Sequence, residues 1–175
     1  ISTDAQALAR SYILEKFGES HITETPRIYK SKNDAQDAHE AIRPTSIYIK
    51  PDDVKSKLTT DQYKLYKLIW ERFAASQMES AEYRITTAQI DAKGHTFRAT
   101  GSEITFKGYM SVYVESQDTK EEKTKALPKL TDKEEVLLQK SESKQHFTQP
   151  PARFSDASLI RELEENGIGR PSTCA

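Results

Sequence analysis

The sequence predicts an α+β fold with a helical N-terminal part, an arch of antiparallel β-strands in the middle and the start of another helical unit at the C-terminal end. Three observations lead to this prediction. In residues 3–17 and 61–78 apolar residues recur every three or four positions, which is typical of amphipathic helices. After residue 80 the spacing changes to two, as in strands, and after residue 155 the helical spacing returns.

The composition limits the classes of protein to which the chain could belong. Its 175 residues include 26 Lys and Arg against 27 Asp and Glu, so a broad basic surface for nucleic acid is excluded and any such contact must be local. No apolar run approaches the roughly 18 residues that a membrane-spanning helix needs. A single cysteine, Cys174, excludes a disulfide framework, and we expect a reducing, cytoplasmic compartment.

The first helix is predicted over residues 3–17. Thr3 and Gln6 have the spacing of a capping box, and Gly18 supplies a C-terminal stop. The apolar stripe of this helix is Leu8, Tyr12, Ile13 and Phe17.

Shorter elements follow. Residues 19–33 are polar and rich in turn-forming residues, which indicates a surface loop. A short helix is predicted over 34–42 and ends before Pro44, because the residue before a proline avoids helical geometry. Another short helix is predicted over 51–58.

The longest helix is predicted over residues 61–78, preceded by a second capping box at Thr59 and Gln62. At 1.5 Å per residue it would be roughly 27 Å long. Its apolar stripe is Leu65, Tyr66, Ile69, Trp70, Phe73 and Ala74. We interpret the aromatic residues at helical spacings as core residues rather than as a nucleophile or a stacking surface; they are Tyr12, Tyr63, Tyr66 and Trp70.

The middle of the chain is predicted to be a meander of short strands. Residues 84–91 are rich in strand formers, and Lys93 and Gly94 form a turn before further strands. The further strands are predicted at 96–100, 103–106 and 109–115. A mobile loop is predicted at 116–126, a last strand at 135–140 and a linker at 150–151. After the linker, Ser155 caps a helix that ends at Asn166 and Gly167, and residues 169–173 open a second helix.

Residues 36–45, QDAHEAIRPT, could carry chemistry. On a helix His39 and Arg43 would share one face, and an imidazole beside a guanidinium can hold a phosphate. The alternative is a surface turn held by salt bridges. A zinc protease site is excluded, because Arg43 stands where HExxH requires its second histidine.

Residues 167–173, GIGRPST, form a second candidate phosphate site. The backbone N–H groups of a helix N-terminus, together with Arg170, Ser172 and Thr173, could cradle a phosphate. The alternative is an ordinary glycine cap followed by a helix that begins with proline. A helix, a glycine turn and a helix also form the skeleton of a helix-turn-helix element, which is too common to establish DNA binding.

Four stretches resemble motifs of the bacterial type IA DNA topoisomerases, in the same order along the chain. They are residues 36–45 (QDAHEAIRPT), 65–78 (LYKLIWERFAASQM), 145–155 (QHFTQPPARFS) and 166–173 (NGIGRPST). Enzymes of this family relax negatively supercoiled DNA by cutting one strand through a 5′-phosphotyrosyl intermediate, passing a strand through the gap and resealing. They use Mg²⁺, bound by acidic residues of a Toprim domain, and no ATP.

The resemblance implies that this chain is an internal fragment. The nucleophilic tyrosine belongs to a YxRTDS motif that would lie just upstream of Ile1, and the Toprim acids would also lie outside the chain. The fragment alone is therefore expected to be inactive. Its domains would be 1–80, the helical part of the tyrosine-bearing domain, 81–147, the β-rich arch, and 148–175, the start of a helical DNA-binding domain.

The resemblance also assigns residues. His39 would be the catalytic histidine that assists proton transfer at the scissile phosphate, with Arg43 nearby in contact with DNA. Arg170, Ser172 and Thr173 would lie at the groove for single-stranded DNA. The partner would be single-stranded regions of negatively supercoiled duplex DNA, in the cytoplasmic nucleoid.

One position departs from the family pattern, since Cys174 stands where the family usually has Tyr. Two other functional classes remain open at this point. One is a stand-alone module that binds single-stranded DNA through residues 167–173, and the other is a protein-interaction module without a nucleic-acid role.

Overall fold

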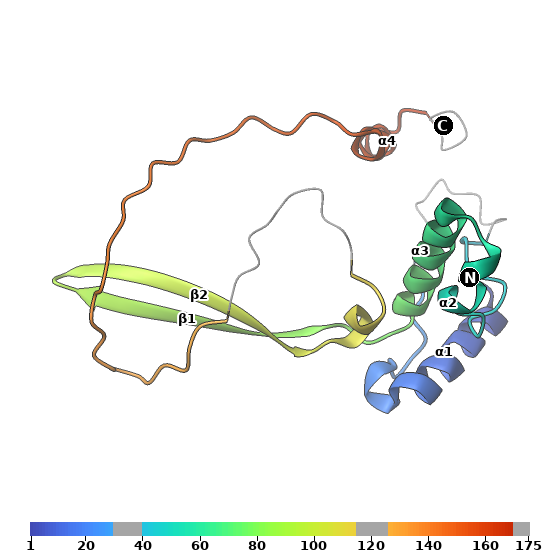
Figure 1. The fold of residues 1–175 in the computed structure, drawn as a ribbon, viewed down its shortest axis with the longest axis horizontal. Coiled ribbons are helices and arrows are strands. Elements are labelled where there is room, and N and C mark those ends of the chain that lie inside the picture. The colour runs from blue at the N-terminus through green and yellow to red at the C-terminus, as the bar shows by residue number, and fades with distance from the viewer. Residues whose placement is uncertain (30–39, 115–125, 170–175) are drawn as a thin grey trace. The chain divides into compact units, whose positions relative to one another are not determined.

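The structure is a computed structural model, and it describes residues 1–29, 40–114 and 126–169. These residues form two compact units, 1–132 and 133–175. The helices and strands of the first unit, shown in Figure 1, are α1 (Thr3–Phe17), α2 (Pro51–Val54), α3 (Thr60–Ser76), β1 (Glu82–Ala92) and β2 (His95–Phe106), and its short 3₁₀ helices are η1 (Glu19–His21), η2 (Lys55–Lys57) and η3 (Gly108–Ser111). The second unit contains α4 (Asp156–Glu165). Helices with an antiparallel pair of strands confirm the α+β fold class.

The core of the first unit lies between α1 and α3. Its buried residues are Ala5, Ala9, Tyr12, Ile47, Trp70, Phe73 and Ala74. The Tyr12 ring meets the Trp70 ring edge-on, with 5.8 Å between the ring centroids. The Trp70 indole N–H donates a hydrogen bond to the Ile47 carbonyl at 2.8 Å, so the polar atom of this buried side chain is satisfied. The core position predicted for these two aromatic residues is confirmed.

The helix ends show where local sequence signals succeed. The capping box of Thr59 and Gln62 precedes α3 as predicted. Gly18 ends α1 with φ +84°, a conformation that favours glycine. The α1 cap itself is Ser2 rather than Thr3, since the Ala5 N–H donates to the Ser2 hydroxyl at 3.4 Å.

Some helix predictions were wrong in detail. The predicted helix over 51–58 is divided into α2 and η2. Leu8 and Leu65, assigned above to the apolar stripes, have 54% and 59% of their surface exposed. In α1 the buried face is formed instead by Ala5, Ala9, Tyr12 and Ile13.

The predicted strand meander is instead one long hairpin. β1 and β2 pair antiparallel, with one register shift between Glu82 and Tyr83 and regular pairing from there to the turn. Gly101, expected to separate two strands, lies inside β2 opposite Thr86. Lys93 and Gly94 form the predicted turn, with φ of +50° and +83°. Positive φ at both positions is typical of a type I′ turn, which suits the twist of a two-residue hairpin. Most side chains of β1 and β2 are exposed.

Two further strand predictions were wrong. Residues 109–115 were expected to be a strand, but Gly108–Ser111 form η3, because Gly108 takes φ +47° and the Tyr109 N–H bonds to the Glu79 carbonyl at 2.8 Å. Residues 135–140 were also expected to be a strand, but in the described part of the chain they pair with no other strand. The residues predicted as a mobile loop, 116–126, lie outside the described residues except for Ala126.

The second unit contains the predicted helix. Ser155 caps α4 by accepting from the Ser158 N–H at 3.3 Å, and Gly167 follows the helix with φ +69°. The second helix predicted from residue 169 lies outside the described residues beyond Gly169. Across the described parts of both units, no helix is long and apolar enough to cross a membrane.

Candidate functional site

The residues that follow His39 are joined to the beginning of α1. Arg43 forms a bidentate salt bridge with Glu40, in which Nε donates to Oε1 at 2.6 Å and Nη2 donates to Oε2 at 3.3 Å. The Ser2 N–H donates to the same carboxylate at 2.7 Å. The pKa of Glu40 is lowered from its ordinary 4.5 to about 2, mainly by the hydrogen bond from the Arg43 guanidinium and secondly by that from the Ser2 N–H. Glu40 is therefore ionised at neutral pH and fixes the chain at this point.

This geometry corrects one sequence-based expectation. Residues 40–43 are not helical, so the helical face on which His39 and Arg43 were predicted to meet is wrong for its described part. His39 itself and the remainder of the predicted helix over 34–42 lie outside the described residues. Arg43 and Glu40 form an ion pair, which agrees with the salt bridge of the alternative interpretation.

The second predicted phosphate site, residues 167–173, is described only as far as Gly169. Arg170, Ser172 and Thr173 lie outside the described residues, as does Cys174. The α4 helix and the glycine turn that precede them are present as predicted.

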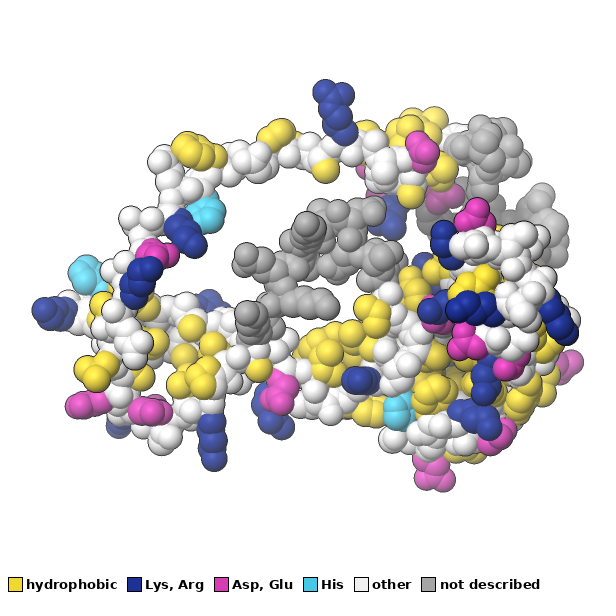
Figure 2. Space-filling model, in the orientation of Figure 1, with side chains coloured by type: hydrophobic (Ala, Val, Ile, Leu, Met, Phe, Trp, Pro, Cys, Tyr) yellow, Lys and Arg dark blue, Asp and Glu magenta, His cyan; other side chains and the backbone are white. Residues whose placement is uncertain are grey.

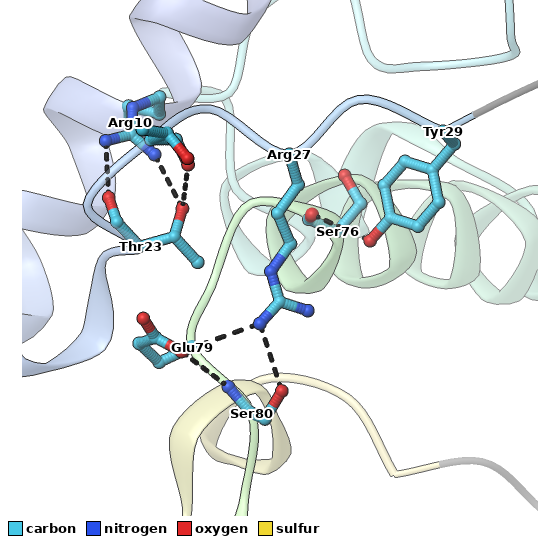
Figure 3. Close-up of polar contacts among 8 residues, drawn as sticks. Arg10, Thr23, Arg27, Tyr29, Ser76, Glu79 and Ser80 are labelled. Carbon is cyan, nitrogen blue, oxygen red and sulfur yellow. Dashed lines mark hydrogen bonds and ion pairs between the residues drawn. The ribbon is translucent and has the colours of Figure 1, made fainter.

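Residues 27–29 lead toward the His39 segment and are held against α1 and α3. The Arg27 carbonyl accepts from the Gln6 amide at 2.8 Å and from the Gln77 amide at 3.3 Å. The Arg27 guanidinium donates to the Ser80 hydroxyl at 3.0 Å and lies 3.5 Å from the Glu79 carboxylate (Figure 3).

Tyr29 adds a further anchor, since its hydroxyl donates to the Ser76 carbonyl at the end of α3, at 2.9 Å (Figure 3). Slightly earlier in the chain, the Arg10 guanidinium binds the hydroxyl and the carbonyl of Thr23 at 2.8 and 2.6 Å. The described part of the predicted surface loop, residues 19–29, is irregular apart from η1 and mostly exposed, as predicted, and these hydrogen bonds hold it against the helices. Nothing in the spacing of these residues indicated the packing.

A groove of about 660 Å³ lies beside residues 27–29. It is bounded by the beginning of α1, residues 27–29 and 41–42, the C-terminal half of α3, and η3 with the residues after it. Its lining residues are Ile1, Thr3, Gln6, Arg27, Ile28, Tyr29, Ala41, Ile42, Arg72, Phe73, Ala75, Ser76, Tyr109 and Tyr113. These described lining residues include two arginines, three tyrosines and no carboxylate. The sequence analysis identified none of the five, because they come from separate parts of the chain.

The groove differs in charge from the surface around it. Figure 2 shows Lys and Arg interspersed with Asp and Glu over the α1–α3 part on the face shown, as the near-zero net charge requires. Within the groove, the Arg72 guanidinium lies over the Tyr113 ring, 5.5 Å from its centroid, and its Nη1 is 3.4 Å from the Tyr113 hydroxyl. A cation over an aromatic face is favourable and has a restricted orientation.

The described residues do not form a magnesium site. Among them, no three His, Cys, Asp or Glu side chains gather closely enough to hold a metal ion. Mg²⁺ requires several oxygen ligands in octahedral geometry, so these residues do not fit it and we derive no step through the metal here.

Comparison with known proteins identifies the fold in which these groups occur. The family model described as DNA topoisomerase matches residues 1–175. The structure of full-length topoisomerase I from Thermotoga maritima matches all of this chain at 34% sequence identity, with a TM-score of 0.72. The chain covers 27% of the Thermotoga protein, about a quarter of its length. On the match to the family model and the agreement of fold, the chain belongs to the bacterial type IA DNA topoisomerases.

Proposed function

We propose that this chain is the part of a type IA DNA topoisomerase that presents a catalytic histidine to the strand being cut. The whole enzyme relaxes negatively supercoiled DNA by cutting one strand through a 5′-phosphotyrosyl intermediate, passing a strand and religating. The match of the family model over the entire chain supports this proposal.

One structural observation carries the assignment of the histidine segment. The chain enters the segment at Tyr29, bound to the Ser76 carbonyl, and leaves it at Glu40, bound to the Ser2 N–H. Both ends are therefore fixed to the same helical unit. A proton-transferring group must be held within hydrogen-bond reach of the reacting oxygen, so fixed ends favour a positioned role for His39.

In this proposal His39 donates or accepts a proton at the scissile phosphate or its leaving oxygen. An imidazole suits this role because its ordinary pKa is near neutrality. Arg43 would lie near the DNA phosphate, and its pair with Glu40 keeps its guanidinium in one orientation.

The remaining assignments extend the proposal to the other parts of the chain. We propose domains at 1–80, 81–147 and 148–175, of which the last begins a helical DNA-binding domain. Arg170, Ser172 and Thr173 would contact the backbone of a single-stranded region. Mg²⁺ would be bound by acidic residues outside this chain, ATP would not be needed, and the enzyme would act at the nucleoid in the cytoplasm.

The test is relaxation of a negatively supercoiled plasmid by the full-length enzyme that carries this chain. We expect His39→Ala to slow relaxation by about 10² to 10⁴, the usual contribution of a general acid or base. The matched control is His95→Ala, which removes an exposed histidine at the start of β2, outside the four motifs. Relaxation by His39→Ala at the rate of the unmodified enzyme would refute the catalytic assignment.

A further inference from the structure

We propose that Glu40 is a positioning residue of the cleavage site, whose carboxylate holds the chain next to His39 against the start of α1 and against Arg43. The inference rests on the proposed function, because it takes His39 as the group that transfers a proton. It adds the residue that determines where His39 can act. Glu40 works through its neighbour in the sequence and does not bind DNA.

The backbone of residues 40–43 is held by side chains rather than by a helix or a strand. These residues are irregular, and no backbone–backbone hydrogen bond between described residues involves them. The Glu40 carboxylate accepts from the Ser2 N–H at 2.7 Å and from Nε and Nη2 of Arg43 at 2.6 and 3.3 Å. These three hydrogen bonds therefore do the work that a helix or a strand would do elsewhere.

Both partners of Glu40 belong to fixed parts of the first unit. Ser2 is the N-cap of α1. Arg43 is followed directly by Pro44, which is buried, and soon afterwards by Ile47, which lies in the core. The carboxylate therefore joins residue 40 to a helix end on one side and to core-anchored chain on the other.

The hold on Glu40 bears on the residue before it. His39 precedes Glu40 in the sequence, and the Cα atoms of neighbouring residues are only about 3.8 Å apart. Fixing residue 40 thus limits the positions that the backbone of residue 39 can take. A proton-transferring group must lie within hydrogen-bond reach of the reacting oxygen, so a positioned backbone favours the proposed role of His39.

The chemistry of Glu40 does not suit a hydrogen bond to a DNA phosphate. Because its pKa is lowered to about 2, the carboxylate is ionised at neutral pH, and an ionised carboxylate only accepts hydrogen bonds. Phosphate oxygens are acceptors as well and carry the same sign of charge, so the two groups repel each other. The partners of Glu40 are therefore protein groups, which is what a positioning residue requires.

The experiment compares relaxation of a negatively supercoiled plasmid, at saturating plasmid, by the full-length enzyme and its variants. We expect Glu40→Ala to slow relaxation about 10- to 100-fold, since misplacing a reacting group by about 1 Å costs on the order of 10²-fold. Glu40→Gln keeps one oxygen for the Ser2 N–H and should recover part of the rate. Glu103→Ala is the matched control, because it removes the carboxylate of another surface ion pair, 3.8 Å from Arg84 in the hairpin, and it should relax DNA normally.

Two further measurements separate positioning from a general loss of structure. The affinity for a fluorescein-labelled oligothymidylate of twelve nucleotides, measured by anisotropy in EDTA, should not fall in Glu40→Ala. The double variant with His39→Ala should relax DNA no more slowly than His39→Ala alone, because Glu40 acts only through that residue. Far-UV circular dichroism and Trp70 fluorescence verify that each variant is folded, and Glu40→Gln takes the place of Glu40→Ala in both comparisons if the latter unfolds.

Three outcomes overturn the inference. They are normal relaxation by Glu40→Ala, a loss of oligonucleotide affinity as large as its loss of rate, and a double variant slower than His39→Ala by the full factor of Glu40→Ala. No recovery in Glu40→Gln would overturn the part assigned to the Ser2 hydrogen bond. Normal relaxation by His39→Ala would reject the proposed function, whereas slow relaxation by His39→Ala with normal relaxation by Glu40→Ala would reject the positioning role alone.

Discussion

Replacement of Gly108 by alanine is expected to loosen the junction between the hairpin and the helices. A Cβ atom added at this position would lie 2.5 Å from the carbonyl oxygens of both Glu79 and Ser80. These are backbone atoms that cannot rotate away, and the Gly108 φ of +47° is itself unfavourable for alanine by about 1 to 2 kcal/mol. Overpacking adds about 1 to 3 kcal/mol, so the expected loss of folding free energy is about 2 to 5 kcal/mol.

Urea unfolding measures this loss. Trp70 is the single tryptophan and lies in the core, so its fluorescence reports on the helices, and far-UV circular dichroism reports on the helices and the hairpin together. Gly94→Ala is the matched control, since Gly94 has φ +83° but a Cβ there meets no atom within 4 Å. This variant should cost only the conformational part, about 1 to 2 kcal/mol. If Gly108→Ala costs no more than Gly94→Ala, the steric argument is wrong.

Two other predictions concern polar contacts of the helical unit. The Glu40 carboxylate should titrate with a pKa of about 2 in the folded protein, seen as the pH dependence of its carboxyl carbon chemical shift, and Arg43→Ala should return it toward 4.5. Because the folded pKa is lowered, the stabilisation from this carboxylate is present above about pH 4.5 and is lost as the pH falls toward 2, and a midpoint near 4.5 in the unmodified protein would contradict the pairing. Arg10→Ala should reduce the free energy of unfolding by about 1 to 3 kcal/mol, because it leaves the buried Thr23 without two hydrogen bonds, and an unchanged urea midpoint would contradict that estimate.

Local signals explain the parts of the fold that the sequence predicted. The capping box at Thr59 and the regular apolar spacing of α3 lie within one continuous stretch, so no distant contact is needed to recognise them. The turn at Lys93 and Gly94 is equally local. The prediction of Thr3 as the α1 cap was wrong by one residue, because Ser2 carries a hydroxyl that serves equally well.

Tertiary contacts explain the failures. Residues 109–115 are rich in Tyr and Val, which favour strands, but the Glu79 carbonyl accepts a hydrogen bond from the Tyr109 N–H. Because Glu79 lies thirty residues earlier, this contact is not visible in the local sequence, and the chain forms η3 here. Gly101 resembled a strand end because glycine weakens strands, yet pairing along β1 continues past it.

The candidate site shows the same limit. Tyr29 follows an irregular loop, Arg72 lies on the exposed side of α3 and Tyr113 follows η3, so no common spacing links them. The motif containing His39 and Arg43 was recognisable because its residues are consecutive. Its helical geometry was wrong for residues 40–43, where Glu40 bonds instead to the Ser2 N–H.

The β1–β2 hairpin is long enough to amplify a rotation at its base. Eleven residues of β1 at about 3.3 Å each extend about 36 Å, so a rotation of about 10° at the base displaces the tip by about 6 Å. The same rotation shifts atoms within a few ångströms of the pivot by less than about 1 Å, which packed side chains absorb without separating. A small rotation where Gly108 meets Glu79 and Ser80 would therefore displace the tip about ten times as far as the base, and the strand length alone sets this ratio.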